Sequence, residues 1–228
     1  MSSIRVIDVE PWDFPEVEPL EFRLTYEGPL YATQGDLIGE QRVTVSRQEH
    51  KRSIRRAFHG QLKHLWEVTP FLKRGFTTGP YEAEIGSWKD GDAQPFTVEN
   101  VAKSHALYGF NFVPLATEDL GIQCGLDILF LRPDPPGKLI QSGDIDNRMK
   151  TLFDCLRVPV PGERWDSLTP ADDEKPFFCL MEDDRLISKI AIETDLLMDP
   201  TAGISDVHLI IKVTLRPSEM HAGVLPFA

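Results

Sequence analysis

The spacing of apolar residues predicts two amphipathic helices. The first covers about residues 47–67, where Ile54, Phe58 and Leu62 recur at helical intervals. The second covers about residues 146–157, and its apolar side chains again share one face: Met149, Leu152, Phe153 and Leu156. Each helix therefore has one side for a core and another side for charged residues.

Short apolar stretches, several of them alternating with polar residues, predict five strands: residues 21–26, 108–114, 121–131, 186–192 and 207–213. Segment 121–131 becomes apolar on both sides toward its end, so we expect burial on both faces. Glycine, proline and polar residues break the pattern at about 68–107 and 159–178, which predicts two insertions. We expect one α+β domain over residues 21–228, after an extended, acidic and proline-rich lead-in at residues 1–20.

Charge is distributed unevenly along this chain of 228 residues, which carries a net charge of −12. That balance argues against a protein that coats nucleic acid nonspecifically, because lysine and arginine drive phosphate binding. Residues 46–75 nevertheless hold eight lysines and arginines against two glutamates. A basic helix face can therefore coexist with an acidic whole, although the charge run taken alone favours a solvated helix face.

The sequence predicts a cytoplasmic protein without a membrane partner. No apolar run approaches the ~20 residues that cross a bilayer, and the first residues lack the apolar core of a signal peptide. The three cysteines are irregularly spaced and match neither a disulfide framework nor a zinc pattern. They are expected to be reduced thiols.

Acidic residues gather where candidate chemistry is expected. Asp144 and Asp146 open the second predicted helix, Lys150 follows one turn later, and Asp183-Asp184 precedes a predicted strand. Mg²⁺ prefers oxygen ligands and takes a few carboxylates from a protein. Taken singly, the aspartates also fit helix capping, and Lys150 also fits a simple i, i+4 partner of Asp146.

Together these residues resemble the RusA family of Holliday-junction resolvases. The resemblance rests on Asp144-x-Asp146-Asn147-x-x-Lys150, on Phe153-Asp154-x-Leu156 and on Asp183-Asp184 before a strand. It is clear over about residues 121–215 and vaguer over 21–67. It implies a mixed β-sheet with helices packed against it, and a homodimer that hydrolyses phosphodiester bonds in Holliday junctions or other branched DNA with Mg²⁺, or alternatively Mn²⁺.

The resemblance also implies roles for individual residues. Asp144, Asp146 and Asp184 would be metal ligands and Lys150 the catalytic lysine. Asp183 is the rival to Asp184, because adjacent side chains at a strand edge point opposite ways. Asp154 is either a group that orients Lys150 or part of a solvent-facing pair. The candidates for contact with the DNA backbone are the basic residues of the first helix: Lys51, Arg52, Arg55, Arg56 and Lys63.

The chain also departs from the family, whose members are small and basic. Its second insertion places Glu163, Asp166, Asp172, Asp173 and Glu174 between the helix motif and Asp183-Asp184. These carboxylates would repel DNA near the site. The alternative hypothesis is therefore a catalytically inactive RusA-like module that binds nucleic acid or protein.

Overall fold

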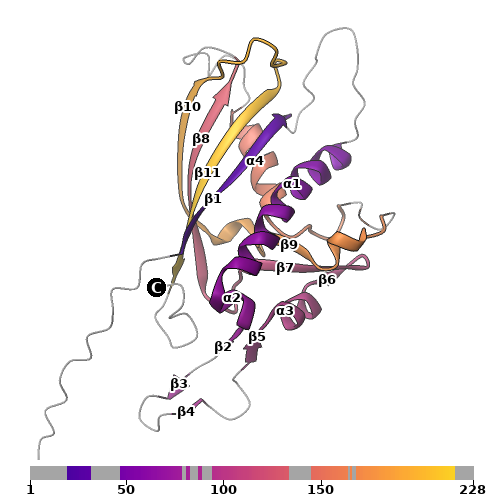
Figure 1. The fold of residues 1–228 in the computed structure, drawn as a ribbon, viewed down its shortest axis with the longest axis vertical. Helices are drawn as coiled ribbons and strands as arrows, with labels where there is room; N and C mark the ends of the chain where they lie inside the picture. Colours follow the sequence, from indigo (N-terminus) through magenta and orange to yellow (C-terminus); the bar gives the residue numbers. More distant parts are fainter. Residues whose placement is uncertain are drawn as a thin grey trace, which may run out of the picture.

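The computed structural model describes residues 20–31, 47–78, 81–82, 87–88, 94–133, 145–163, 165 and 168–218. It confirms an α+β fold (Figure 1). The main sheet has the strand order β1 (Glu21–Pro29), β11 (Asp206–Pro217), β8 (Ile122–Arg132) and β10 (Ile187–Leu196). β11 is antiparallel to β1 and β8, whereas β10 is parallel to β8, so the sheet is mixed.

A second sheet holds β6 (Ala106–Leu107), β7 (Phe110–Ala116) and β9 (Phe177–Met181). β7 and β9 are parallel, and all five residues of β9 are buried. Two small antiparallel ribbons pair β2 (Phe76–Thr78) with β5 (Gln94–Phe96) and β3 (Tyr81–Glu82) with β4 (Ser87–Trp88).

The helices are α1 (Arg47–Val68), α2 (Pro70–Arg74), α3 (Val98–Ser104) and α4 (Ile145–Leu156), with 3₁₀ turns η1 (Asp172–Glu174) and η2 (Asp184–Leu186). The predicted stripe of α1 is confirmed: Ile54, Phe58 and Leu62 are buried against the core. α1 packs on β1, β9 and α4. None of the helices that the structure describes has both the length and the apolar character to cross a bilayer.

The second predicted insertion is wrong in part, because residues 159–178 contribute to a core. Trp165 lies edge-on to Phe110, Phe112 and Phe177, with ring centroids 4.8, 5.4 and 5.8 Å away. Phe177 and Phe178, assigned to the loop, begin strand β9. The first insertion, over residues 68–107, does contain short strands, but it also contains α2 and α3, which the sequence analysis missed.

Arg55 on α1 is the buried charge at the centre of this packing. Its side chain is almost fully enclosed, and its guanidinium lies 2.8 Å from the Glu163 carboxylate and donates to the main-chain oxygen of Asp154. The guanidinium carbon also lies 5.5 Å from the centre of the Trp165 ring. One arginine thus connects α1, α4 and segment 159–178.

Further ion pairs extend from Arg55 to form an ion-pair network, made of Lys51, Arg52, Arg55, Arg56, Asp154, Arg157, Glu163 and Glu174. Asp154 pairs with Lys51 at 2.6 Å and with Arg157 at 2.7 Å. Glu174 is buried and pairs with Arg52 and Arg56. Burial raises the pKa of Glu174, but the arginines and a backbone N–H lower it more, so the pKa lies below its usual range. The carboxylate therefore stays charged in the folded protein.

Arg55→Ala tests whether this network holds the fold together. Removing one partner of a buried ion pair typically costs about 3–5 kcal/mol, and Glu163 would keep Arg157 at 3.4 Å and the main-chain N–H of Val160 at 3.5 Å. We expect a loss of that order in the free energy of unfolding, measured by urea denaturation. The exposed Arg74, which donates to the main-chain oxygen of Pro70, is the matched control. Equal stability of Arg55→Ala and Arg74→Ala would contradict the role of Arg55.

Candidate functional site

The first turns of α4 expose the residues of the predicted motif. Asp146 and Lys150 lie on the outer side, with side chains 69% and 66% exposed and with 3.9 Å between the carboxylate and the ammonium group. The inner side of α4 is held by buried Met149 and Leu152, and the Thr151 hydroxyl donates to the main-chain oxygen of Tyr31. The amphipathic pattern thus fixes the helix and leaves Asp146 and Lys150 accessible.

The two rival aspartates have different surroundings. Asp183 caps η2, where its carboxylate accepts a hydrogen bond from the main-chain N–H of Arg185 at 3.0 Å. Asp184 begins η2 and is exposed. The pair lies in a cap and a 3₁₀ turn and not at a strand edge, which corrects the geometry expected from the sequence. η2 contacts α4 and β8, so Asp184 belongs to an element next to the motif helix.

A complete metal centre is not contained in the part of the chain that the structure describes. Asp144 lies outside the described residues, and within them no three His, Cys, Asp or Glu side chains gather as metal ligands. The structure brings Asp146 together with Lys150. The turn that bears Asp184 contacts α4, but the chain leading into it is bonded to the residues just after the helix, where the N–H of Val158 donates to the main-chain oxygen of Met181. Asp184 also acts electrostatically on Arg157, and it is not brought together with Asp146. The chain matches no protein-family model, no curated protein and no solved structure.

Asp154 does not contact Lys150 as a group that orients it. Its carboxylate forms ion pairs with Lys51 and Arg157. Burial raises the pKa of Asp154, and its hydrogen bonds to Lys51 and Arg157 lower it more, so that it stays below its usual range. Asp154 therefore belongs to the ion-pair network and not to the exposed end of α4.

Two buried arginines that the sequence analysis did not single out lie close to the motif in the chain. Arg148 stands between Asp146 and Lys150 on the inner side of α4, and Arg132 ends β8 on the face of Ile128 and Phe130. They are 7% and 4% exposed. Two guanidinium nitrogens of each, Nε and Nη1 of Arg148 and Nε and Nη2 of Arg132, have no hydrogen-bond partner among the described residues.

Such donors favour an anionic ligand, because an enclosed cation without an acceptor is costly. A phosphate or carboxylate oxygen would satisfy guanidinium N–H groups well. The sequence contains a signal for Arg148, since it falls four residues before Leu152 on the apolar stripe. Helical periodicity places this position on the side of the apolar stripe, but no burial was predicted for it.

The basic residues predicted to contact DNA are mostly engaged inside the protein. Arg55 is buried, and Lys51 and Arg52 are about one-fifth exposed and paired with Asp154 and Glu174. Arg56 is half exposed but also pairs with Glu174. Lys63 is half-buried and forms no ion pair with another described residue. The expected solvated face is therefore covered in large part by segment 159–178, the acidic insertion.

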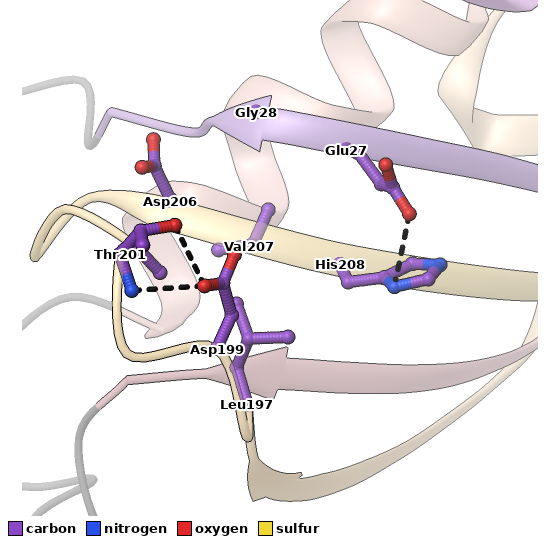
Figure 2. Close-up of a pocket in the computed structure, with 9 residues that line it drawn as sticks. Glu27, Gly28, Leu197, Asp199, Thr201, Asp206, Val207 and His208 are labelled. Carbon is purple, nitrogen blue, oxygen red and sulfur yellow. Dashed lines mark hydrogen bonds and ion pairs between the residues drawn. The ribbon is translucent and has the colours of Figure 1, made fainter.

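A separate acidic hollow lies between the end of β1, the loop that joins β10 to β11, and the start of β11 (Figure 2). Its carboxylates already have partners within the protein. Asp199 accepts hydrogen bonds from the N–H and hydroxyl of Thr201, Asp206 accepts one from the N–H of Gly203, and Glu27 lies 3.3 Å from His208. These contacts shape the turn before β11, and none of the predicted site residues lines the hollow.

The cysteines do not offer a nucleophile. All three are free and buried, as the sequence analysis predicted for their redox state. Burial raises the pKa of Cys124, Cys155 and Cys179 to about 12. The thiols are therefore protonated near neutral pH, and protonated thiols are poor nucleophiles.

Arg148→Met tests whether the buried arginine lacks a partner in the free protein. Removing an uncompensated buried charge while keeping an apolar side chain is expected to raise the free energy of unfolding by about 1 kcal/mol or more. Thermal and urea unfolding measure this change, with the exposed Arg216→Met as control. A loss of stability in Arg148→Met would show that the guanidinium has an internal partner.

Proposed function

We propose that the chain is a Mg²⁺-dependent DNA endonuclease of the RusA type that hydrolyses phosphodiester bonds in Holliday junctions or other branched DNA. The observation that carries the proposal is the exposed pair Asp146 and Lys150 in the first turns of α4, a helix that also contacts the turn that bears Asp184. Charged groups of both signs, exposed on adjoining rigid elements, suit binding of a metal ion together with a phosphate.

The exposed carboxylates fit a hard cation. The 3.9 Å between Asp146 and Lys150 exceeds a hydrogen bond, so the oxygens of Asp146 are available to another ligand. Asp146 and Asp184 would hold the ion together with Asp144. Bound Mg²⁺ supplies positive charge for the scissile phosphate and lowers the pKa of a coordinated water.

The cationic residues of α4 would act on the phosphate. The Lys150 ammonium neutralises charge on the non-bridging phosphate oxygens, as a compact and mobile donor. Arg148 offers N–H donors that have no acceptor among the described residues, and guanidinium groups match phosphate geometry. On α1, Lys63 and the half-exposed Arg56 carry the proposed backbone contact, while Lys51 and Arg52 would first have to leave their carboxylates and Arg55 would have to leave its buried site.

A RusA-type enzyme is expected to be a homodimer, whose two sites cut opposing strands of a substrate with approximate two-fold symmetry. A cytoplasmic location agrees with three free, buried cysteines.

The second candidate function is a binding module without turnover. The observation that favours it is the neutralisation of the α1 cations by Glu163 and Glu174.

Asp146→Asn separates the two functions. With Mg²⁺ and a four-way junction, the wild type is expected to nick two strands symmetrically and to leave a matched linear duplex largely intact. Asp146→Asn should lower the cleavage rate at least about 100-fold, because altering even the outer partners of a metal site costs 10–100-fold. Its exposure means that folding should be unchanged, which circular dichroism and thermal unfolding check.

The exposed Asp119 lies in the turn before β8, and Asp119→Asn is the matched control that should retain activity. Lys150→Met should lower cleavage while junction binding persists. Junction binding by the wild type without cleavage in either Mg²⁺ or Mn²⁺ would support the binding module and overturn the enzyme.

A further inference from the structure

The two edges of the main sheet differ in their contacts with the rest of the protein. On the β1 edge, Gln61 of α1 accepts a hydrogen bond from the main-chain N–H of Thr25 at 2.9 Å and donates one to its main-chain oxygen at 2.8 Å. β10 forms the opposite edge (Figure 1). In the part of the chain that the structure describes, no strand pairs with the outer side of β10.

β10 has the properties of a strand that pairs with another one. It is 10 residues long and contains no proline, and its only register shift lies at its start, between Ile187 and Lys189. Ile190 and Ile192 are 48% and 38% exposed. Natural edge strands are usually short, bulged, charged or covered, because an open apolar edge recruits a partner strand. β10 carries charged residues on one face, but it is long and its isoleucines are exposed on the other.

The exposed isoleucines continue the core side of the sheet. Ile190 and Ile192 are paired with Leu126 and Ile128 of β8, which are buried. Paired residues of neighbouring strands share a face, so both isoleucines lie on the face that α1 and α4 cover further along the sheet. The apolar layer thus extends to the edge and stops there uncovered.

The sequence of β10 is self-complementary when two copies run antiparallel about Ala191. Each Ile190 then faces Ile192 of the second copy, and each Lys189 faces Glu193. Ser188 faces Thr194 in the same register. Apolar pairs, opposite charges and hydroxyl pairs are the cross-strand combinations that stabilise antiparallel strands. Moving the axis to Ile192 would set Ala191 against Glu193 and Ile190 against Thr194, which is less complementary.

We propose that two copies of this chain pair through β10, antiparallel and centred on Ala191, to form one continuous sheet of eight strands. The inference deepens the proposed function, since it supplies the interface of the expected homodimer. A two-fold axis normal to the sheet keeps both α4 helices on the same face. Both candidate sites would therefore face one side, where a two-fold symmetric DNA junction can reach them.

Lys189 is exposed enough to pair with Glu193 of a second copy. It pairs with Asp127 of its own sheet at 2.8 Å while its side chain remains 62% exposed. In the paired sheet its ammonium would lie between Asp127 and Glu193 of the second copy. Lys189 would then lie opposite a carboxylate from each copy, an electrostatic complementarity that an unrelated apolar partner would lack.

Measurement of the molecular mass in solution and disulfide trapping both test the proposal. Light scattering during gel filtration should give twice the mass of the 25.8 kDa chain. Ala191→Cys should form an intersubunit disulfide in high yield under mild oxidation, because residues opposite each other across antiparallel strands have Cα atoms about 4.5–5.5 Å apart. The native cysteines are free and buried, so the wild type serves as the uncrosslinked control.

Glu193→Cys is the register control. In the proposed pairing the two introduced thiols of this variant would lie about 13 Å apart along the strands, too far for a disulfide. Mixing Lys189→Cys with Glu193→Cys should restore crosslinking between unlike chains. Higher yield from Ile192→Cys or Glu193→Cys than from Ala191→Cys would overturn the proposed register, and a monomeric wild type would overturn the interface.

Ile190→Asp should weaken dimerisation at least tenfold in sedimentation equilibrium, because it places a carboxylate in the apolar contact. Val68→Asp, on an exposed residue at the end of α1, should leave the mass unchanged. A mass unchanged by Ile190→Asp would place the dimer contact elsewhere. These readouts do not depend on DNA cleavage, so an inactive but dimeric protein would sink the proposed function and leave the interface standing.

Discussion

The burial of the Arg55 guanidinium constrains much of this structure. An enclosed cation requires acceptors, and Arg55 finds them in the Glu163 carboxylate and the Asp154 main chain. Glu163 belongs to segment 159–178, which also pairs with α1 through Glu174. The contact of Arg55 with Glu163 positions Trp165 over the guanidinium and among the phenylalanines of the second sheet. The acidic insertion is thus part of the fold's framework, and its acidity matches the charge of α1.

The two ends of α4 differ in their contacts with the rest of the protein. Its last turn is tied into the ion-pair network through Asp154 and Arg157, which fixes the helix against α1. Its first turns carry Asp146 and Lys150 outward, and their only mutual contact is long. A rigid helix anchored at one end and open at the other is a good support for a site, because anchoring limits the motion of exposed side chains.

Periodicity predicted α1, α4, β1, β8 and β11, which each bury one face, and β10, whose residues are all exposed or half-buried. The expected burial of segment 121–131 on both faces is wrong, because buried and half-buried residues alternate along β8 to its end. Periodicity failed for β9, because Phe177–Met181 is buried throughout and follows a polar, proline-containing stretch, so neither alternation nor flanking apolar residues marked it. Of the candidate site, the i, i+4 placement of Asp146 and Lys150 followed from helix geometry. The pairing of Arg52, Arg55 and Arg56 with distant carboxylates did not, because it depends on tertiary contacts more than 100 residues apart in the chain.

Comparison of the buried arginines points to where an anionic substrate would bind. Arg55 and Arg157 are each matched by carboxylates within the protein. Arg132 and Arg148 are equally enclosed, yet their N–H groups find no acceptor in the described part of the chain. The Nε of Arg55 also has no partner among the described residues, so the difference between the arginines lies in the carboxylates that Arg55 and Arg157 contact. Leaving Arg148 without an acceptor on the inner side of α4, opposite Asp146 and Lys150, lowers stability, and a bound anion that reached the guanidinium would recover it. Binding and folding would then be coupled at the exposed end of α4.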